Sequence, residues 1–338
     1  MSADLRSTAR AIVAPGKGIL AADESTGTIK KRFDAIGLVS TEDRRRAYRE
    51  MLFTTKGAAE FIGGVILYDE TIRQSAADGR MLVQVLIDQG VIPGIKVDAG
   101  AKALALAPGE LVTEGLDGLR ERLIEYRGLG ARFAKWRAVI TIGDGLPTGN
   151  CARVNAHALA RYAALCQDEG IVPVVEPEVL MDWSNTIERC GEVTRETLHT
   201  VFDALHDQGV ALEGMLLKPN MVISGKQCAV QASVDEVADA TIACFREVVP
   251  AAVPGIVFLS GGQSEEVATA HLDAMNRRGP HPWELSFSYG RALQAAAIKA
   301  WGGSDEHVGA GQAAFLKRAR LNGAARSGAY DPASERTA

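Results

Sequence analysis

The chain has 338 residues, of which 47% are hydrophobic, and its formal net charge is -5. This length is compatible with one α/β barrel, and the apolar fraction is sufficient for a large core. The charge balance, without a long block of like charge, excludes nucleic acid and an anionic membrane as expected partners. Anionic small molecules remain compatible with it, because local cations matter more for them than the total charge.

The cysteines and the N-terminus bear on the cellular compartment. The five cysteines are scattered, odd in number and never in a C-x-x-C pair, so we expect reduced thiols rather than disulfides or a zinc knuckle. They are Cys151, Cys166, Cys190, Cys228 and Cys244. The first residues lack an apolar signal core, and no apolar stretch is long enough to span a bilayer. The sequence therefore predicts a soluble cytoplasmic protein.

The first element expected along the chain is a helix within residues 1–13, outside the main fold. Eight short apolar segments follow, and each ends in polar or charged residues. They are residues 18–23, 62–69, 92–98, 132–141, 170–180, 212–221, 255–262 and 283–290. Between them lie stretches of helical period, as at Leu116, Leu119, Leu123 and Tyr126. This alternation predicts an α/β fold, a (β/α)8 TIM barrel formed by residues 14–301.

An open doubly wound sheet is the alternative architecture, but no G-x-G-x-x-G follows the first predicted strand. Residues 302–338 are predicted to add a helix around residues 312–321 and then a flexible tail, because the end of the chain is rich in Gly, Ala and Ser. The whole chain, residues 1–338, is thus interpreted as a single domain.

Lys218 is the most informative single residue. It follows the largely apolar segment 212–217 and precedes Pro219, which places a cation at the end of a buried strand. Burial disfavours the charged form of a lysine, and the neutral amine that results can form a Schiff base with a carbonyl. The alternative is a lysine that extends its ammonium group out of the edge of the core.

Three predicted strands carry charged residues two positions apart near their carboxyl ends, where the active site of an α/β barrel opens. Residues two apart share one strand face. The pairs are Lys96 and Asp98, Lys135 and Arg137, and Glu176 and Glu178. With Asp23 and Lys218 at other strand ends, they are expected to converge on one pocket, where Lys135 would favour a neutral neighbouring lysine and Glu176 would act as general acid–base. Structural ion pairs that close the barrel top are the alternative.

Two glycine-containing segments suggest a phosphate site. Ser260, Gly261 and Gly262 end the seventh predicted strand, and Ser288, Gly290 and Arg291 end the eighth. Glycines let backbone N–H groups approach an anion, each segment leads into a helix N-terminus, and an arginine can clamp a phosphate. Ordinary turn glycines are the alternative.

A third cluster follows the first predicted strand and could hold a second phosphate. Its hydroxyl groups belong to Ser25 and Thr28. In the basic run that follows, Lys30 and Lys31 are interpreted as a solvated helix face, and spacing alone does not decide the role of Arg32.

The histidines and serines argue against other chemistries. The six histidines are dispersed, with no i+4 pair and no H-x-H, so no metal site is predicted. No serine lies in a G-x-S-x-G context, which argues against that class of hydrolase.

Seven stretches carry a resemblance to a known family. They are IVAPGKGILAADESTG at 12–27, GIKVD at 94–98, FAKWR at 133–137, VEPE at 175–178, LKPNMV at 217–222, FLSGGQSEE at 258–266 and FSYGRAL at 287–293. Together and in this order they resemble the class I (Schiff-base) fructose-bisphosphate aldolases, from about Ile12 to about Tyr330. The resemblance implies a lyase of glycolysis and gluconeogenesis that cleaves fructose 1,6-bisphosphate reversibly to dihydroxyacetone phosphate and glyceraldehyde 3-phosphate.

Carried over position by position, the resemblance implies catalytic roles for the residues already singled out. Lys218 matches the Schiff-base lysine, and Glu176, supported by Glu178, matches the general acid–base of carbinolamine dehydration. Asp23 matches the residue that takes the hydroxyl proton as the carbon–carbon bond breaks. Lys135 matches the cation that assists carbinolamine chemistry.

The resemblance also implies two phosphate sites for a phosphorylated ketose. One is matched by Ser260, Gly261, Gly262, Ser288, Gly290 and Arg291. The other is matched by Ser25, Thr28, Arg32 and Lys96, with Arg45 and Arg137 as further candidates. The family is usually a homotetramer and needs neither a metal nor another cofactor.

The sequence departs from animal members at two places. Thr28 stands where they have a serine, which keeps the hydroxyl group. Animal members end in a tyrosine that helps to protonate the enamine, whereas this chain ends in Ala338 and its last tyrosine is Tyr330.

Two rival functions stay open at this stage. One is another Schiff-base barrel aldolase or a transaldolase. The other is a catalytically silent scaffold that binds sugar phosphates or cytoskeletal partners, although the retention of Lys218, Glu176 and Asp23 argues against it. The preference between monophosphate and bisphosphate ketoses is also open.

Overall fold

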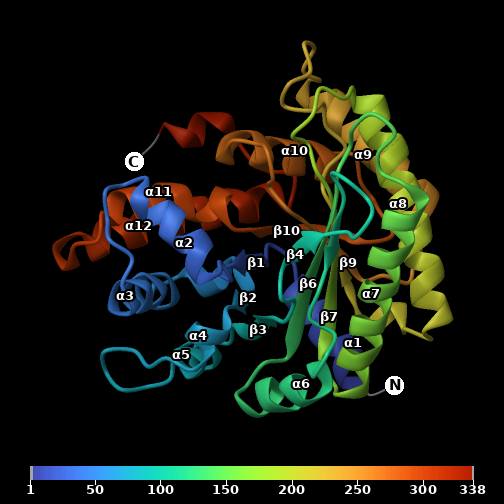
Figure 1. Ribbon diagram of the computed structural model, residues 1–338. Coiled ribbons are helices and arrows are strands. Elements are labelled where there is room, and N and C mark those ends of the chain that lie inside the picture. Colours follow the sequence, from blue (N-terminus) through green and yellow to red (C-terminus); the bar gives the residue numbers. More distant parts are fainter. Residues whose placement is uncertain (1–2, 337–338) are drawn as a thin grey trace.

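The barrel is seen in a computed structural model that describes residues 3–336. Eight parallel strands close in the order β1–β10–β9–β8–β7–β6–β3–β2 (Figure 1). They are β1 (Gly18–Ala21), β2 (Ile62–Leu67), β3 (Ile92–Lys96), β6 (Phe133–Ile140), β7 (Val172–Val179), β8 (Leu216–Leu217), β9 (Gly255–Phe258) and β10 (Glu284–Tyr289). Each lies within one of the eight predicted segments, so the predicted (β/α)8 TIM barrel is confirmed.

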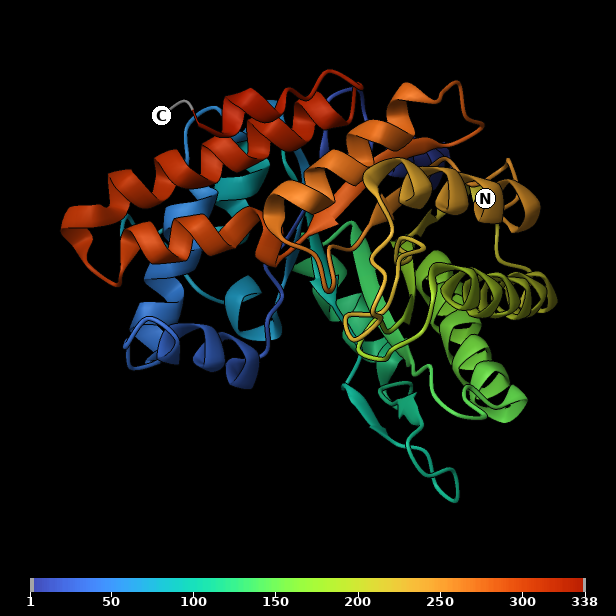
Figure 2. The ribbon, with the colours of Figure 1, turned by 90° about the horizontal axis from the view of Figure 1, so that it is seen from above.

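Helices connect the strands and surround them (Figures 1 and 2). They are α1 (Ala3–Ile12), α2 (Thr26–Asp34), α3 (Glu42–Phe53), α4 (Asp69–Ile72), α5 (Leu82–Asp88), α6 (Leu119–Gly128), α7 (Gly149–Asp168), α8 (Ile187–Asp207), α9 (Val234–Val248), α10 (Glu265–Arg277), α11 (Arg291–Trp301) and α12 (Val308–Ala325). Short 3-10 helices lie at η1 (Ala58–Glu60), η2 (Leu212–Gly214), η3 (Asp305–His307) and η4 (Pro332–Glu335). Within residues 3–336, no helix has both the length and the apolar character needed to cross a membrane.

Strand parity divides the core into two parts. Ile19 of β1 points into the barrel interior, whereas its neighbour Leu20 packs with the surrounding helices. The predicted N-terminal helix, α1, contributes Leu5, Ala9 and Ile12 to the interior cluster. This helix therefore closes the amino end of the barrel and leaves the carboxyl end for the site (Figure 1).

The interior at the start of β6 is filled by the ring of Phe133, which is fully buried. A Cβ atom at Gly94 would lie 2.4 Å from this ring, and one at Gly64 would lie 2.9 Å from it. The glycines on β2 and β3 are needed because the neighbouring strand presents a large side chain to the same layer.

Two details differ from the predicted strands. The segment 212–221 holds only a two-residue strand, because η2 occupies its first part and Pro219 has no N–H to continue the ladder. An antiparallel hairpin of β4 (Ala101–Ala103) and β5 (Leu111–Thr113) follows β3 and was not predicted. Its strands are too short and too exposed to show alternation in the sequence.

The described part of the segment predicted as a flexible tail is hydrogen-bonded to the barrel's outer helices. Tyr330 is buried, and its backbone N–H donates to Oδ1 of Asp273 at 2.9 Å. Glu335 accepts hydrogen bonds from Tyr330 Oη and Arg318 Nη1. The predicted helix around 312–321 is confirmed as the longer α12, and these anchors hold the Gly- and Ala-rich segment behind it against α10 and α12.

Candidate active site

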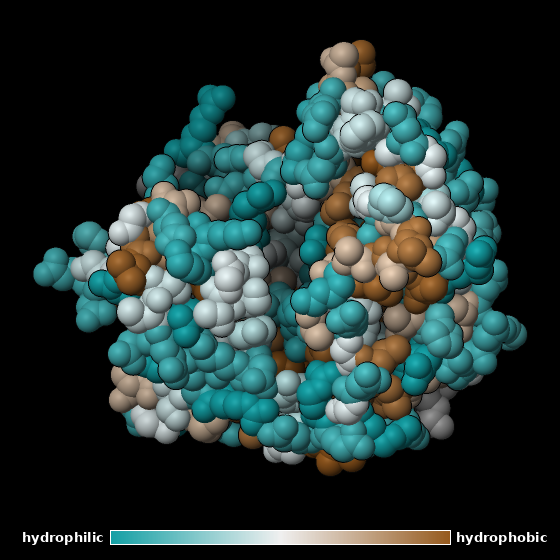
Figure 3. Space-filling view, viewed as in Figure 1, coloured by the Kyte–Doolittle hydropathy of each residue, from teal (hydrophilic) through white to brown (hydrophobic). Residues whose placement is uncertain are grey.

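The carboxyl ends of the strands surround a cleft of about 720 Å³. Figure 3 shows the molecule hollowed near its middle, between the part formed by α2 and the part formed by α7 and α8. Predicted site residues that line the cleft are Asp23, Ser25, Thr28, Arg32, Lys96, Lys135, Arg137, Glu176, Glu178, Lys218, Ser260, Gly261, Ser288, Gly290 and Arg291. The predicted convergence of the strand ends on one pocket is confirmed.

A chain of alternating charges crosses the floor of the cleft. Nζ of Lys218 lies 3.1 Å from Oε1 of Glu176, and Nζ of Lys135 lies 3.3 Å from Oε2 of the same carboxylate. Nζ of Lys135 also lies 2.8 Å from Oδ2 of Asp23. The side chains of Lys218 and Glu176 are only 5% and 4% exposed, so these interactions are shielded from water.

The register of the strands explains why these charges meet. Lys135 on β6 lies beside Lys96 on β3, and Arg137 lies beside Glu176 on β7. In parallel strands, adjacent residues in register present their side chains to the same face. Residues at three neighbouring strand ends are thus brought together by backbone pairing.

The neighbouring charges in the cleft shift the pKa values of Asp23 and Lys135. Burial alone would raise the pKa of Asp23, but Lys135 and Lys218 outweigh it and hold this pKa well below its usual value. Burial would lower the pKa of Lys135, but Asp23 and Glu176 outweigh it and hold this pKa well above its usual value. Asp23 is therefore an ionised base, and Lys135 is a firmly protonated cation.

Further ion pairs flank the charge chain. Nζ of Lys96 lies 2.7 Å from Oδ1 of Asp98 and donates to the backbone carbonyl of Asp98 at 2.9 Å. Nε of Arg137 donates to Oε2 of Glu178. Arg137 and Glu178 thereby form one wall of the cleft next to Glu176.

The loops after β9 and β10 meet at one corner of the cleft, which we call the anion-binding corner after the phosphate site predicted there. Ser264 caps α10, since its side chain accepts from the backbone N–H of Val267. α11 starts directly after Gly290 and has no side-chain cap. Gly290 and Arg291, at the start of α11, line the cleft, which is the placement predicted for a phosphate site at a helix N-terminus.

The cluster after β1 joins this corner. Ser25 caps α2, and Oγ of Ser25 lies 3.1 Å from Oγ1 of Thr28. A Cβ atom at Gly290 would lie 3.5 Å from Nη2 of Arg32, so this arginine stands between the two predicted phosphate sites. Spacing alone did not decide the role of Arg32, whereas the family resemblance matched it to this phosphate site, and the structure places it in the cleft wall.

A family model described as "Fructose-bisphosphate aldolase class-I" matches residues 4–338. The chain belongs to the class-I fructose-bisphosphate aldolase family. It is 59% identical over 329 residues to the "Probable fructose-bisphosphate aldolase class 1" of Xanthomonas campestris pv. campestris, which covers 96% of this chain and 98% of the relative. It is 52% identical over 328 residues to "Fructose-bisphosphate aldolase 4, cytosolic" of Arabidopsis thaliana, with coverages of 97% and 84%.

A solved structure agrees with this assignment. Fructose-bisphosphate aldolase from Plasmodium falciparum, in a ternary complex with TRAP and a small-molecule inhibitor, superposes with a TM-score of 0.96 at 49% identity. The match covers 97% of this chain and 95% of the other. Class-I aldolases cleave fructose 1,6-bisphosphate in glycolysis through a Schiff base and without a metal ion. The predicted family, the lyase reaction and its Schiff-base mechanism are therefore confirmed.

Two predicted binding residues of this aldolase do not line the cleft. Nη2 of Arg45 on α3 lies 2.6 Å from Oε2 of Glu70 at the start of α4. Gly262 has a φ of 78° and turns the loop after β9, and a Cβ atom there would meet Met181 behind the loop. The prediction for Arg45 is corrected. Gly262 forms the turn of the loop but does not itself line the cleft.

The sequence missed a buried polar network beneath Asp23. Oε2 of Glu24 lies 2.5 Å from Nη2 of Arg49, and Arg32 donates to Oε1 of Glu24. Nε2 of Gln294 donates to Glu24 at 2.9 Å. Burial would raise the pKa of Glu24, but Arg49 and Arg32 outweigh it and lower this pKa. The network orients Arg32 toward the cleft. In the sequence, the network was marked only by Glu24, the acidic residue next to Asp23.

Tyr330, the last tyrosine of the chain, is not among the residues that line the cleft. It lies beside α10, and its hydroxyl group donates to Glu335 at 2.9 Å. The described residues 3–336 also contain no group of His, Cys, Asp and Glu side chains arranged to hold a metal ion.

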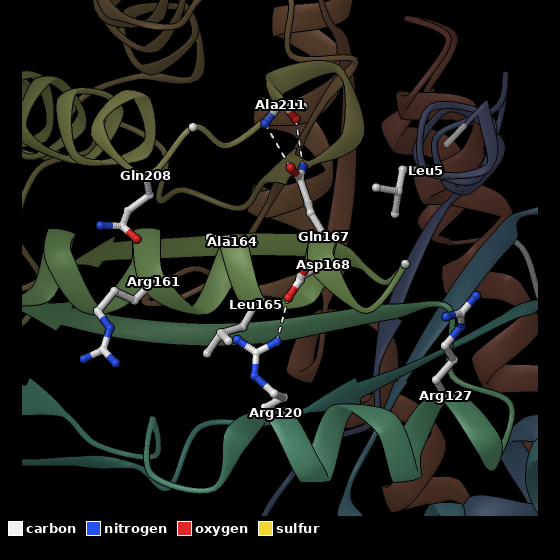
Figure 4. A pocket seen from close by; sticks show the side chains of 12 residues that line it. Leu5, Arg120, Arg127, Arg161, Ala164, Leu165, Gln167, Asp168, Gln208 and Ala211 are labelled. Atoms are coloured by element: carbon white, nitrogen blue, oxygen red, sulfur yellow. Dashed lines mark hydrogen bonds and ion pairs between the residues drawn. The ribbon is translucent and has the colours of Figure 1, made fainter. Parts of the chain in front are cut away.

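A second charged hollow lies on the outside of the barrel between α6, α7 and the end of α8 (Figure 4). We call it the arginine groove, after Arg120, Arg127 and Arg161. The three guanidinium groups are spread along the groove and do not point to a common centre (Figure 4). Arg120 is neutralised by Asp168, 2.6 Å away. The groove therefore lacks the convergent charges of the cleft.

Proposed function

We propose that Lys218 is the lysine that forms the Schiff base in this aldolase. Three lysines line the cleft, among the residues that the structure describes. Lys135 is held as an ammonium ion by two carboxylates, and Lys96 is bound twice by Asp98. Among the described residues, Lys218 forms its ion pair with Glu176, 3.1 Å away, and this carboxylate can take its proton. This arrangement is the observation that carries the proposal.

Schiff-base formation needs a neutral amine and a proton for the departing water. Lys218 passes one proton to Glu176, and its nitrogen attacks the C2 carbonyl of the ketose. The carbinolamine forms when the oxygen takes a second proton from the attacking nitrogen. Glu176 then protonates the hydroxyl group, which leaves as water. An ammonium ion and a ketone have become an iminium ion and water, so no proton is exchanged with solvent.

Carbon–carbon cleavage uses the iminium ion as an electron sink. Asp23 removes the proton of the C4 hydroxyl group, and the C4–O bond becomes a carbonyl as the C3–C4 bond breaks. The bonding pair moves into the iminium ion and leaves an enamine on Lys218. Lys135, 2.8 Å from Asp23, keeps this carboxylate ionised and stabilises negative charge that develops nearby. Glyceraldehyde 3-phosphate is then released.

The enamine is protonated at C3 and hydrolysed to dihydroxyacetone phosphate. We assign this proton to a group of the cleft rather than to Tyr330, because the Tyr330 hydroxyl group is bound to Glu335 outside it. Exchange of the C3 hydrogen of dihydroxyacetone phosphate with deuterated water measures this step. Tyr330→Phe is expected to leave the exchange rate within about twofold, since a single neutral hydrogen bond contributes little.

The two phosphates bind on either side of this chemistry. Ser260, Gly261, Ser288, Gly290 and Arg291 hold one through backbone N–H groups and a guanidinium fork. The second is bound by Ser25, Thr28, Arg32 and Lys96. Glu178 and Arg137 form the wall that keeps Glu176 in place.

Borohydride reduction in the presence of fructose 1,6-bisphosphate, followed by peptide mapping, tests the proposal. The expected product carries the ketose-derived group on Lys218. Attachment to Lys135 or Lys96 would contradict the assignment. A control digest without substrate identifies non-specific reduction.

Three further features accompany the proposed mechanism. The reaction needs neither a metal nor a cofactor, so activity is expected to survive EDTA. Homotetramer formation, expected from the family resemblance, is tested by sedimentation velocity. Cytoplasmic localisation is supported by the Arabidopsis relative named as cytosolic, and cell fractionation tests it.

A further inference from the structure

Arg318 on α12 is a buried arginine far from the cleft in sequence. Its side chain is 4% exposed. A guanidinium group in such a position must be fully hydrogen-bonded, because an unpaired buried charge costs several kcal/mol. Its partners therefore identify the elements that it joins.

The guanidinium group joins the first turns of two helices. Nη2 donates to the backbone carbonyl of Glu265 at 2.8 Å and to Oγ1 of Thr269 at 2.5 Å, both on α10. Nε donates to the backbone carbonyl of Ala292 on α11 at 3.4 Å. The fork of one arginine thus ties the start of α10 to the start of α11.

These two helices follow the two loops of the anion-binding corner. α10 begins at Glu265, after the loop of Ser260 and Gly261, and α11 begins at Arg291, after Gly290. The N–H groups that face a phosphate are fixed relative to one another only if the two helix starts are fixed. Arg318 supplies that fixed distance without touching the cleft.

The C-terminal segment completes the contact. Oε1 of Glu335 accepts from Nη1 of Arg318 at 2.5 Å and from Oη of Tyr330 at 2.9 Å. The backbone carbonyl of Glu335 accepts from Nζ of Lys317 at 2.8 Å. The segment turns back from α12, and η4 lies beside α10 (Figures 1 and 2). Glu335 neutralises Arg318 and fixes its fork in the position that bridges the helices.

We propose that Arg318, held by Glu335, is a positioning residue for phosphate binding. Together they form a brace that sets the spacing of the loops after β9 and β10. The inference rests on the proposed function of these loops, and it adds two residues outside the cleft and a role for the C-terminal segment. Loss of the brace is expected to weaken binding of phosphate groups while leaving chemistry at Lys218 unchanged.

The test compares ligands with and without phosphate in Arg318→Lys and Glu335→Gln. Arg318→Lys keeps the charge but cannot bridge both helices and Glu335 at once. Inorganic phosphate is the binding probe, measured by calorimetry. Its Kd and the KM of fructose 1,6-bisphosphate are expected to rise about three- to tenfold, with kcat within about twofold. Borohydride trapping of unphosphorylated dihydroxyacetone on Lys218 is expected to proceed at the wild-type rate.

Arg320→Lys is the matched control, because Arg320 lies on the same helix and is exposed. It is expected to leave every readout unchanged. Thermal melting checks folding, and if Arg318→Lys does not fold, the milder Glu335→Gln decides. Unchanged phosphate affinity in the folded variants would overturn the brace, and so would equal losses for phosphate and dihydroxyacetone. A wild-type enzyme that traps no dihydroxyacetone on Lys218 would contradict the proposed catalytic lysine instead, while phosphate calorimetry still decides the brace.

Discussion

The cleft and the arginine groove are both lined by charged side chains, but they hold these charges differently. In the cleft, the side chains of Lys135 and Asp23 are 5% and 12% exposed, and Lys135 contacts a second carboxylate. In the groove, the side chains of Arg120 and Asp168 are 49% and 65% exposed. Water screens the groove pair, whereas the barrel wall shields the cleft charges and strengthens their fields. A site is thus marked by convergence and burial of charge rather than by its presence.

The largest effect is expected from the amine at the end of the charge chain. Lys218→Arg keeps the positive charge beside Glu176 but removes the nitrogen that forms the iminium ion. We expect kcat/KM to fall by about 10⁴-fold or more, as for the loss of a covalent nucleophile. The coupled assay for glyceraldehyde 3-phosphate measures it. Lys30→Arg, at an exposed lysine paired with Asp34, is the matched control and is expected to retain full activity.

The next effect is expected from the carboxylate between the two lysines. Glu176→Gln preserves size but removes the group that relays the proton of Lys218. We expect kcat to fall by about 10² to 10⁴-fold, the range for general acid–base catalysis. Rapid-quench borohydride trapping should show slow imine formation. Trapping at the wild-type rate would assign the relay to another residue.

A buried histidine near the loop after β9 makes the stability of the protein sensitive to acid. His271 on α10 contacts Gln263 of the β9 loop, with Nδ1 and Oε1 2.7 Å apart, and burial lowers its pKa to about 4. Because the folded pKa lies below the ordinary value of 6.5, protonation favours the unfolded chain. The stability contribution of neutral His271 is complete above pH 6.5 and is lost as the pH falls toward 4. Urea unfolding of the wild type and of His271→Asn from pH 7 to pH 4 measures this contribution. As the pH falls, the free energy of unfolding of the wild type should decrease more than that of the variant. A pH-independent difference would contradict the prediction.

The smallest effect is expected in the arginine groove. Arg120→Ala removes an exposed ion pair with Asp168, and solvent replaces the lost interaction. We expect the melting temperature and kcat/KM to remain within experimental error of wild type. A clear loss of activity would show that the groove contributes to function and would break the contrast with the cleft.

The barrel and the centre of its site could be predicted because both depend on local patterns. Apolar segments that end in charges marked the strands, and two-residue spacing placed Lys135 and Arg137 on one face. The family resemblance then assigned the chemistry. Residues such as Lys96 and Glu176 were found because their strand positions decide where their side chains point.

The rest depends on contacts between distant parts of the chain. Arg49 lies in a charged helix that looks solvated in sequence, yet it is buried against Glu24. Arg45, four residues earlier on the same helix, looked like a phosphate ligand and instead pairs with Glu70. The C-terminal segment was predicted to be flexible from its composition, whereas Tyr330 and Glu335 anchor it. Helix orientation and tail docking carry no periodic signal that a single sequence reveals.

The seam of the barrel has a consequence for how the enzyme is made. β1 pairs with β10, with Ile19 beside Ser288 and Leu20 beside Tyr289, although the two strands stand at opposite ends of the barrel sequence. A ribosome releases β1 long before it makes β10, so this pairing is a late event in synthesis. The proposed phosphate-binding corner spans the seam, with Arg32 on one side and Gly290 on the other. A nascent chain that lacks β10 therefore lacks one side of the proposed substrate pocket, so we expect substrate binding only after the ring has closed.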